Sequence, residues 1–157
     1  MSVSEDFIKP YVESALNIFA TMLAMDPKWI GTREKIDNKV FGEITGIMGT
    51  SEGGAEGLIV ASFSRNLALR IGAGFLGMEV TEVNDDVKEC IRELVNMIAG
   101  GAKAKLEGTP YFFMLSIPTV VTGTNMEIHH KPGHFCVVGE MALDGESFVI
   151  EVSMKRA

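Results

Sequence analysis

Apolar residues between Asp85 and Leu106 recur at spacings of three and four, which is the period of an α-helix with one buried face. The residues of this apolar stripe are Val87, Ile91, Leu94, Ile98, Ala102 and Leu106. Asn84 precedes the segment and is a favourable N-cap, and Gly108 follows it as a stop. The pattern therefore predicts a long helix over residues 85–106, around which we organise the rest of the chain.

The opposite face of this helix carries residues that are poor for a purely structural role. At about 100° per residue, Glu93, Asn96 and Gly100 lie away from the apolar stripe, and Glu93 and Asn96 are neighbours because they are three residues apart. Asn and Gly each cost about 0.5–1 kcal/mol relative to Ala in a helix. These three residues are consequently our candidates for a functional site, and the alternative from the pattern alone is an ordinary solvated face.

A second helical stripe lies near the N-terminus. Its apolar residues are Ile8, Val12, Leu16, Phe19 and Leu23, and the helix is expected to end at about Met25. Ser2 and Glu5 have the spacing of a capping box. Proline is tolerated only near the first turn of a helix, so Pro10 predicts that the helix begins later than this capping box suggests.

The middle of the chain predicts two strands and a short helix. Val40–Met48 and Gly57–Phe63 have the pattern of strands, and the Gly-rich segment between them is predicted to be a turn of hairpin length. Ser64 can cap a helix that runs to Leu76, with Gly77 as its stop. The passage that begins at Trp29 gives no clear prediction.

The last third of the chain predicts mainly extended structure. The predicted segments are Phe112–Ile117, Thr119–Gly123, His134–Ala142 and Glu146–Met154. Pro118 interrupts the first two, and Asp144-Gly145 is a turn signal that joins the last two as a hairpin. A long helix followed by strands thus occurs twice, which indicates a weak internal duplication within one domain of residues 1–157.

Composition excludes several classes of function. A net charge of −7 in 157 residues argues against binding to nucleic acid or to an anionic membrane surface. Cys90 and Cys136 lie within apolar patterns, as expected for reduced core thiols and not for a disulfide framework. The longest apolar stretch, Ala15–Met25, is too short to span a bilayer, and the first residues have no basic region of a secretory signal. We therefore expect a cytoplasmic protein.

Two further patterns suggest ligands but lack the required context. The glycines that end at Gly77 match G-x-G-x-x-G, yet they fall at the end of a predicted helix instead of at a strand-to-helix turn. His129, His130 and His134 lie near Glu127, but no Cys pair has the spacing of a zinc site. We interpret the glycines as packing residues and the histidines as part of a solvated loop, so no metal site is predicted.

The segment E-L-V-N-M-I-A-G-G from Glu93 to Gly101 resembles the motif helix of the CheC/CheX/FliY phosphatases of bacterial chemotaxis, and is most similar to that of CheX. The family pattern is Asp or Ser, Glu four residues later, Asn three after that, and Pro some twenty-odd residues on. Glu93 and Asn96 match its centre, Glu89 replaces the Asp or Ser, and Pro118 comes about one residue early. Similar runs are ITGIMG near Ile44, SFSRNLALRIGAGFLG from Ser62 and IPTVVTG from Ile117.

The resemblance implies a phosphatase that hydrolyses the aspartyl phosphate of a CheY-type response-regulator receiver domain. In the family the Asn orients the attacking water, and the Glu contacts a Lys of the receiver; Asn96 and Glu93 would take these roles here. No cofactor of the chain's own is implied, because the receiver supplies Mg²⁺. Glu89, Gly100 and Lys103 of the same helix are our candidates for residues that bind the partner.

The resemblance also implies a fold and an assembly. We expect one α+β domain with a largely antiparallel sheet and the two long helices together on one face, and a homodimer joined through edge strands as in CheX relatives. Two-site relatives carry a second E-x-x-N on the first helix; here Glu13 and Asn17 are four apart, so we interpret them as surface residues. The alternative function is a non-catalytic receiver-binding or flagellar-switch-like domain of the same fold, and a small-molecule sensor has only the Gly-rich turns in its favour.

Overall fold

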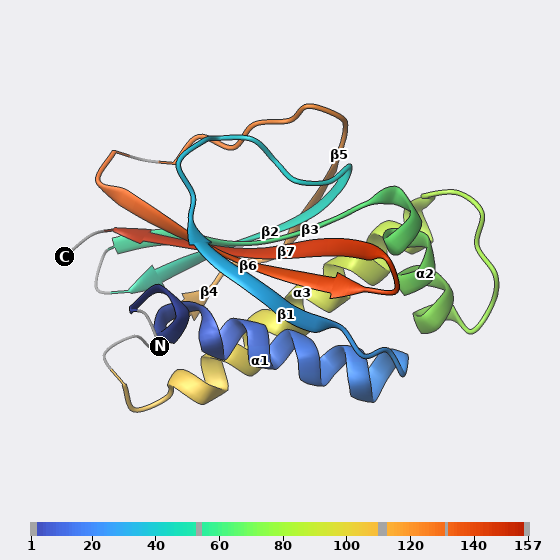
Figure 1. The fold of residues 1–157 in the computed structure, drawn as a ribbon, viewed down its shortest axis with the longest axis horizontal. Coiled ribbons are helices and arrows are strands. Elements are labelled where there is room, and N and C mark those ends of the chain that lie inside the picture. The colour runs from blue at the N-terminus through green and yellow to red at the C-terminus, as the bar shows by residue number, and fades with distance from the viewer. Residues whose placement is uncertain (1–2, 53–54, 110–112, 131, 156–157) are drawn as a thin grey trace.

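The chain forms one α+β domain with a seven-stranded antiparallel sheet and three helices (Figure 1). The computed structural model describes residues 3–52, 55–109, 113–130 and 132–155. The helices are α1 (Val3–Leu23), α2 (Arg65–Leu76) and α3 (Asp85–Leu106). The strands are β1 (Lys28–Glu34), β2 (Ile44–Glu52), β3 (Ala55–Phe63), β4 (Met114–Leu115), β5 (Thr119–Thr122), β6 (His134–Leu143) and β7 (Glu146–Lys155). As predicted, α1 and α3 pack together on one face of the sheet.

The strand order has an approximate two-fold symmetry. The order is β1-β6-β7-β3-β2, and both β4 and β5 pair with β2. Exchanging α1, β1, β2 and β3 with α3, β5, β6 and β7 gives the same order read backwards. One row across the sheet shows the relation, because Gly46 pairs with Ala61, Ala61 with Ile150, and Ile150 with Gly139. The internal duplication predicted from the order of elements is therefore present in the topology.

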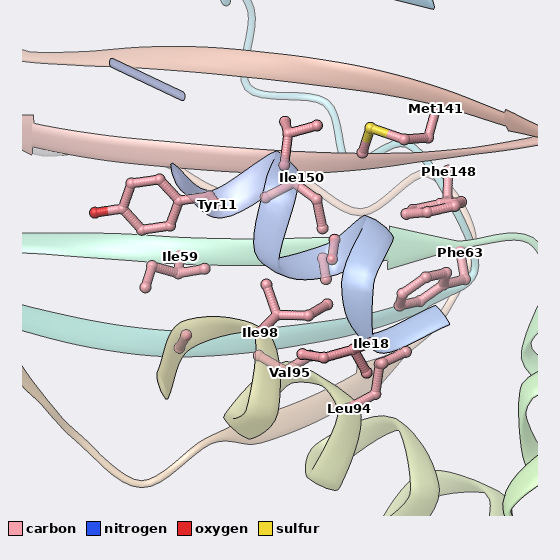
Figure 2. Packing of buried hydrophobic residues seen from close by; sticks show 14 of the residues in the cluster. Tyr11, Ile18, Ile59, Phe63, Leu94, Val95, Ile98, Met141, Phe148 and Ile150 are labelled. Atoms are coloured by element: carbon pink, nitrogen blue, oxygen red, sulfur yellow. The ribbon is translucent and has the colours of Figure 1, made fainter. Parts of the chain in front are cut away.

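The core lies between the sheet and the helices, as Figure 2 shows. Its labelled side chains are Tyr11 and Ile18 from α1, Leu94, Val95 and Ile98 from α3, and Ile59, Phe63, Met141, Phe148 and Ile150 from the sheet. The ring of Phe148 stacks on Phe19 with centroids 4.8 Å apart and lies 5.3 Å from Phe63. Because each such side chain contributes about 1.5–3 kcal/mol on burial, this layer fixes the helices against the sheet.

Glycines on the strands let each long helix approach the sheet closely. A Cβ atom on Gly46 of β2 would lie 2.3 Å from Cγ2 of Val95 in α3. A Cβ atom on Gly139 of β6 would lie 2.8 Å from Cγ2 of Val12 in α1. Both distances are shorter than any real contact between carbon atoms, so the two glycines are required for the observed spacing between each helix and the sheet. Gly46 and Gly139 occupy equivalent places in the two halves of the fold.

The other face of the sheet is covered by two connections, 35–43 and 123–130, which arch over it in Figure 1. They hydrogen-bond to each other, since Val40 N donates to Met126 O at 3.0 Å and Ile128 N donates to Asn38 O at 2.8 Å. The side chain of Lys35, at the start of the first connection, forms a buried ion pair with Glu151 of β7. Polar groups on this face are thus shielded from solvent by loops instead of by helices.

The predicted caps of α2 and the C-terminal hairpin are confirmed. Ser64 caps α2 by accepting a hydrogen bond from Leu67 N at 3.2 Å, and Gly77 ends it with a left-handed φ of 68°. β6 and β7 pair along their whole length across Asp144 and Gly145, whose φ values are 49° and 81°. Positive φ at both central residues is what a tight type I′ hairpin turn requires.

The prediction that Pro10 would delay the start of the first helix is wrong. α1 already includes Val3, and Pro10 lies inside it. The backbone hydrogen bond that proline cannot make is outweighed by the complete burial of Ile8, Tyr11 and Val12 on either side of it. Ser2, the proposed cap, lies outside the described residues.

The hairpin predicted between these two strands is confirmed, but most of the segment 49–57 that was predicted as its turn belongs to the strands. The β2–β3 ladder continues through it as far as the pair Glu52 and Ala55. Gly57 serves as a strand residue, since a Cβ atom there would lie 2.2 Å from the carbonyl oxygen of Ser153 in β7. The lack of a side chain at Gly57 therefore allows β3 and β7 to approach closely. β2 also begins at Ile44 instead of the predicted Val40.

The remaining differences concern short strands. The passage at Trp29, which gave no prediction, is strand β1 and pairs with β6. The expected segment Phe112–Ile117 contributes only Met114–Leu115 as β4, and Phe112 lies outside the described residues. β5 covers Thr119–Thr122 directly after Pro118, as predicted within one residue.

Candidate functional site

α3 follows the predicted pattern along its whole length. Asn84 caps it by accepting a hydrogen bond from Val87 N at 3.0 Å, and two acidic residues in its first turn complement the helix dipole. The buried residues are Val87, Cys90, Ile91, Leu94, Val95, Ile98, Ala99, Ala102 and Leu106. Glu93 and Asn96 are exposed on the opposite side, so neither is needed to complete the core.

The candidate residues form one line along the exposed face of α3. Glu89, Glu93, Asn96, Gly100 and Lys103 are separated by four, three, four and three residues, which places them in a single stripe. We call this row of five residues the α3 stripe. None of its members lines the cavities of about 500, 460, 330 and 320 Å³, so the α3 stripe is a helix surface outside these cavities. Such a surface suits a macromolecular partner that brings its own pocket.

Gly100 and Gly101 are adjacent but have different surroundings. Gly100 is exposed, and a Cβ atom there would have nothing within 4 Å. A Cβ atom on Gly101 would lie 2.2 Å from Oγ of Ser14 in α1. Packing within the described part of the chain therefore explains Gly101 but does not explain Gly100.

The ends of the α3 stripe have partners within the chain. The carboxylate of Glu89 forms an ion pair with Arg92 one turn later. Nζ of Lys103 lies 4.0 Å from the sulfur of Met114, which is 59% exposed on β4. Half-buried Pro118 immediately precedes β5, and β5 contacts α3.

The equivalent face of α1 lacks the pair of side chains found on α3. Under the two-fold relation Val12 corresponds to Val95, so Pro10 and Glu13 take the places of Glu93 and Asn96. Glu13 is exposed, with its Oε1 4.0 Å from Nζ of Lys105. These positions support the interpretation of Glu13 as a surface residue and leave one candidate site per chain.

The sequence reasoning missed one side chain close to this site. Ser14 of α1 is 3% exposed, and its hydroxyl donates a hydrogen bond to the carbonyl oxygen of Ile98 in α3 at 2.8 Å. The sequence gives little signal for it, because Ser14 lies outside the predicted apolar stripe of the first helix and Gly101 is one of two adjacent glycines in the other long helix. Neither feature alone reveals that the two meet.

The histidine cluster and the cysteines do not add a second site. Nε2 of His129 lies 3.8 Å from a carboxylate oxygen of Glu127, and among the described residues no group of three or more His, Cys, Asp or Glu side chains could hold a metal ion. Both cysteines are free and buried, as predicted. Burial, and secondarily the charge of Glu151, raises the pKa of Cys136 to about 12, so its thiol stays protonated.

The helices also bear on the expectation about membranes. Within the described ranges, no helix has the length and apolar character needed to cross a bilayer.

Comparison with known sequences points to one family. Residues 44–150 match the family described as chemotaxis phosphatase CheX. The chain is 36% identical over 77 residues to the CheY-P phosphatase CheX of Thermotoga maritima, an alignment that covers 48% of this chain and 50% of that protein. The matched region thus spans about half the length of this curated relative.

Comparison with solved structures covers nearly the whole chain. A CheC-like superfamily protein from Shewanella sp. PV-4 superposes with a TM-score of 0.88 at 30% identity, covering 99% of this chain and 100% of that one. The structure of the CheX–CheY–BeF3–Mg²⁺ complex from Borrelia burgdorferi matches with a TM-score of 0.77 at 22% identity, covering 96% of this chain and 99% of that one. The second likeness is one of fold alone.

Proposed function

The chain belongs to the chemotaxis phosphatase CheX family, and on this premise we propose that it hydrolyses the aspartyl phosphate of a CheY-type receiver domain. The observation that carries the proposal is the position of Asn96. Its side chain is exposed on α3 one turn from Glu93, and Gly100 one turn further on leaves open space beside it. This arrangement supports a helix face that enters the active site of a second protein.

The proposed reaction needs no nucleophile from this chain. Water attacks phosphorus as the bond from phosphorus to the aspartyl oxygen breaks, which yields a carboxylate and inorganic phosphate, with the water proton going to the phosphate product. The amide of Asn96 can accept a hydrogen bond from this water through its oxygen or donate one through its nitrogen. Because an acyl phosphate is already reactive, correct placement of the water supplies most of the required acceleration.

Glu93 has a separate role in the proposal. As an exposed carboxylate one turn before Asn96, it can pair with a lysine of the receiver and hold the helix in register. Glu89 and Lys103 complete the contact at the two ends of the α3 stripe. Mg²⁺ belongs to the receiver, in keeping with the presence of Mg²⁺ and BeF3 in the Borrelia burgdorferi CheX–CheY structure.

We further propose that two copies pair through an edge strand. β1 is bonded only to β6, and β4 and β5 only to β2, so each side of the described sheet ends in an unpaired edge. An exposed isoleucine lies at each edge: Ile30 on β1 is 60% exposed, and Ile117 beside β5 is 86% exposed. Unpaired edges with apolar side chains readily associate.

Light scattering tests whether the protein is a dimer. The measurement is made at tens of micromolar, about the concentration at which interfaces of ordinary size form. Ile30→Lys and Ile117→Lys are a matched pair, because only the variant at the joined edge should dissociate. A monomeric wild-type protein at this concentration would contradict the proposal.

The function is tested by mixing the protein with phosphorylated receiver domains and following the release of inorganic phosphate. Catalytic amounts should accelerate phosphate loss over the receiver's own rate. A separate binding measurement with a receiver activated by BeF3⁻ and Mg²⁺ tests the alternative function, a receiver-binding domain without catalytic activity. Binding without any acceleration would identify a receiver-binding domain that is not a phosphatase.

A further inference from the structure

The two long helices approach each other closely at Ser14 of α1 and Gly101 of α3. A Cβ atom on Gly101 would lie 2.2 Å from Oγ and 3.2 Å from Cβ of Ser14. Ser14 is 3% exposed, so its hydroxyl is enclosed at this crossing. Only glycine at 101 allows the helices to approach this closely while the hydroxyl remains between them.

This hydroxyl joins α1 to the backbone of α3. Oγ of Ser14 donates to the carbonyl oxygen of Ile98 at 2.8 Å, a bond between residues 84 positions apart. A helical carbonyl has a second lone pair besides the one used by the amide four residues later, so Ile98 can accept this additional bond without breaking the helix. Replacing the hydroxyl by hydrogen would remove the bond and leave a small gap in its place.

The bond lies in the turn of α3 that carries the candidate site. Ile98 comes between Asn96 and Gly100 in the sequence; Ile98 is buried, and Asn96 and Gly100 are exposed. On the side of the sheet, Val95 rests on Gly46 at the close distance described above. The backbone on either side of Asn96 is therefore held from two directions, by the sheet through Val95 and by α1 through Ile98.

We infer that Ser14 is a positioning residue for Asn96: its hydrogen bond to Ile98 fixes the height and rotation of the turn that presents the amide to the attacking water. The inference rests on the proposed function. Ser14 touches no substrate and acts only through the backbone of α3. Since a misplacement of about 1 Å can cost about a hundredfold in rate, a partial shift of this turn should be visible in turnover.

The matched control is Ser62. It is also a fully buried serine with hydrogen bonds, one from Gly42 N at 2.8 Å and one shared with Oγ1 of Thr45 at 2.8 Å. It lies on β3 and its partners are on the connection before β2 and on β2 itself, so it has no bond to α3. Ser62→Ala thus reproduces the loss of a buried hydroxyl without touching the helix crossing.

The experiment compares wild type, Ser14→Ala and Ser62→Ala in steady-state dephosphorylation of the receiver, at a temperature where circular dichroism shows all three folded. Ser14→Ala should lower kcat about tenfold with KM within about twofold of wild type. Ser62→Ala should leave kcat unchanged. In hydrogen exchange, amides of residues 99–102 should exchange about tenfold faster in Ser14→Ala only. Ser14→Cys keeps a weak hydrogen-bond donor, so its kcat and its protection of amides 99–102 should lie between those of Ser14→Ala and wild type. If Ser14→Ala does not fold, Ser14→Cys takes its place in the comparison.

Two different failures can be told apart. If the wild-type protein does not accelerate phosphate loss, the proposed function fails, whatever Ser14→Ala does. If the wild type is active and Ser14→Ala keeps the kcat of Ser62→Ala, the hydroxyl has only a structural role and the inference is overturned. Equal exchange at residues 99–102 in wild type and Ser14→Ala would also overturn it.

Discussion

Gly46 of β2 and Val95 of α3 are so close that a Cβ atom on the glycine would lie 2.3 Å from Cγ2 of the valine. Val95 immediately precedes Asn96, so this contact determines how deeply the turn bearing the candidate site sits on the sheet. Gly139 and Val12 form the corresponding contact under α1. The depth of both long helices is therefore set by the absence of a side chain on a strand.

Gly46→Ala should destabilise the protein by about 1–3 kcal/mol, because the added methyl group must displace Val95 or the helix. Combining it with Val95→Ala removes the clashing Cγ2 and leaves Val95 Cβ at 3.2 Å. The double variant should consequently be less destabilised than the sum of the single changes. Urea denaturation midpoints, compared at unchanged m-values, measure these differences in stability. Strictly additive effects would contradict the contact between Gly46 and Val95.

Gly100 and Gly101 offer a matched pair within one helix turn. Gly100→Ala should raise the free energy of unfolding by about 0.5–1 kcal/mol, because the new Cβ meets nothing within 4 Å and Ala is the better helix former. Gly101→Ala should instead lower it by about 1–3 kcal/mol through the clash with Ser14.

The same pair separates stability from recognition. If the receiver approaches Gly100 closely, Gly100→Ala should raise KM for the receiver although the protein is more stable. Thermal denaturation and steady-state kinetics on both variants provide the measurements. A Gly100→Ala protein with wild-type KM would exclude close approach at this position.

The elements whose structure depends on local spacing could be predicted from the sequence. The buried stripe of α3, its Asn84 cap and the hairpin at Asp144 and Gly145 are set by neighbours within four residues. The exposure of Glu93 and Asn96 follows from the same periodicity, since they lie opposite the stripe. Their roles in catalysis and binding stay predictions.

The elements that depend on distant contacts could not be predicted. Thr50 and Ser51 lie in a segment with the composition of a turn, but they are strand residues because β2 pairs there with both β3 and β4. Pro10 is accommodated in α1 because its neighbours bury completely. Ser14 and Gly101 are each unremarkable in the sequence, and only the packing of α1 on α3 brings them together.

His130 makes a prediction about pH. Burial, and then the nearby charges of Lys35 and His134, lowers the pKa of His130, and its buried Nε2 has no hydrogen-bond partner within the described structure. Because the unfolded chain binds this proton at a higher pH than the folded protein, stability should fall as the pH drops through the ordinary histidine range near about 6.5. Between about pH 7.5 and about pH 5.5, the Tm of wild type should fall further than that of His130→Gln, which retains all other titrating groups. Equal shifts in the two proteins would show that His130 does not contribute.

Glu93→Ala tests the anchoring role of this carboxylate. Loss of a partly desolvated charge pair with a receiver lysine should weaken recognition by about 1–3 kcal/mol, seen as a raised KM with a smaller fall in kcat. The effect should shrink as ionic strength rises, because salt screens an exposed pair. Glu13→Ala, the same change on the exposed face of α1, is the control and should leave KM unaltered. A collapse of kcat at constant KM would instead place Glu93 in the chemical step.

Asn96→Ala separates stability from activity at the centre of the site. Asn96 is exposed on a helix for which it has poor propensity, so alanine should leave the Tm unchanged or raise stability by a few tenths of a kcal/mol. Phosphatase activity should be largely lost, because the attacking water loses the amide that orients it. Binding to a receiver carrying BeF3⁻ and Mg²⁺ should largely survive, since one side chain is a small part of such an interface.

Asn96→Asp and Asn17→Ala define what the amide itself contributes. Asp keeps the size of the side chain but replaces the donor with a negative charge beside the phosphoryl group, so Asn96→Asp should be as inactive as Asn96→Ala. Asn17→Ala makes the same amide deletion on the exposed face of α1 and should retain full activity. Retention of wild-type kcat by Asn96→Ala would refute the proposed mechanism, because no other exposed amide lies on the α3 stripe to orient the water. Loss of activity together with a lowered Tm would refute it as well, since the defect would then be one of folding.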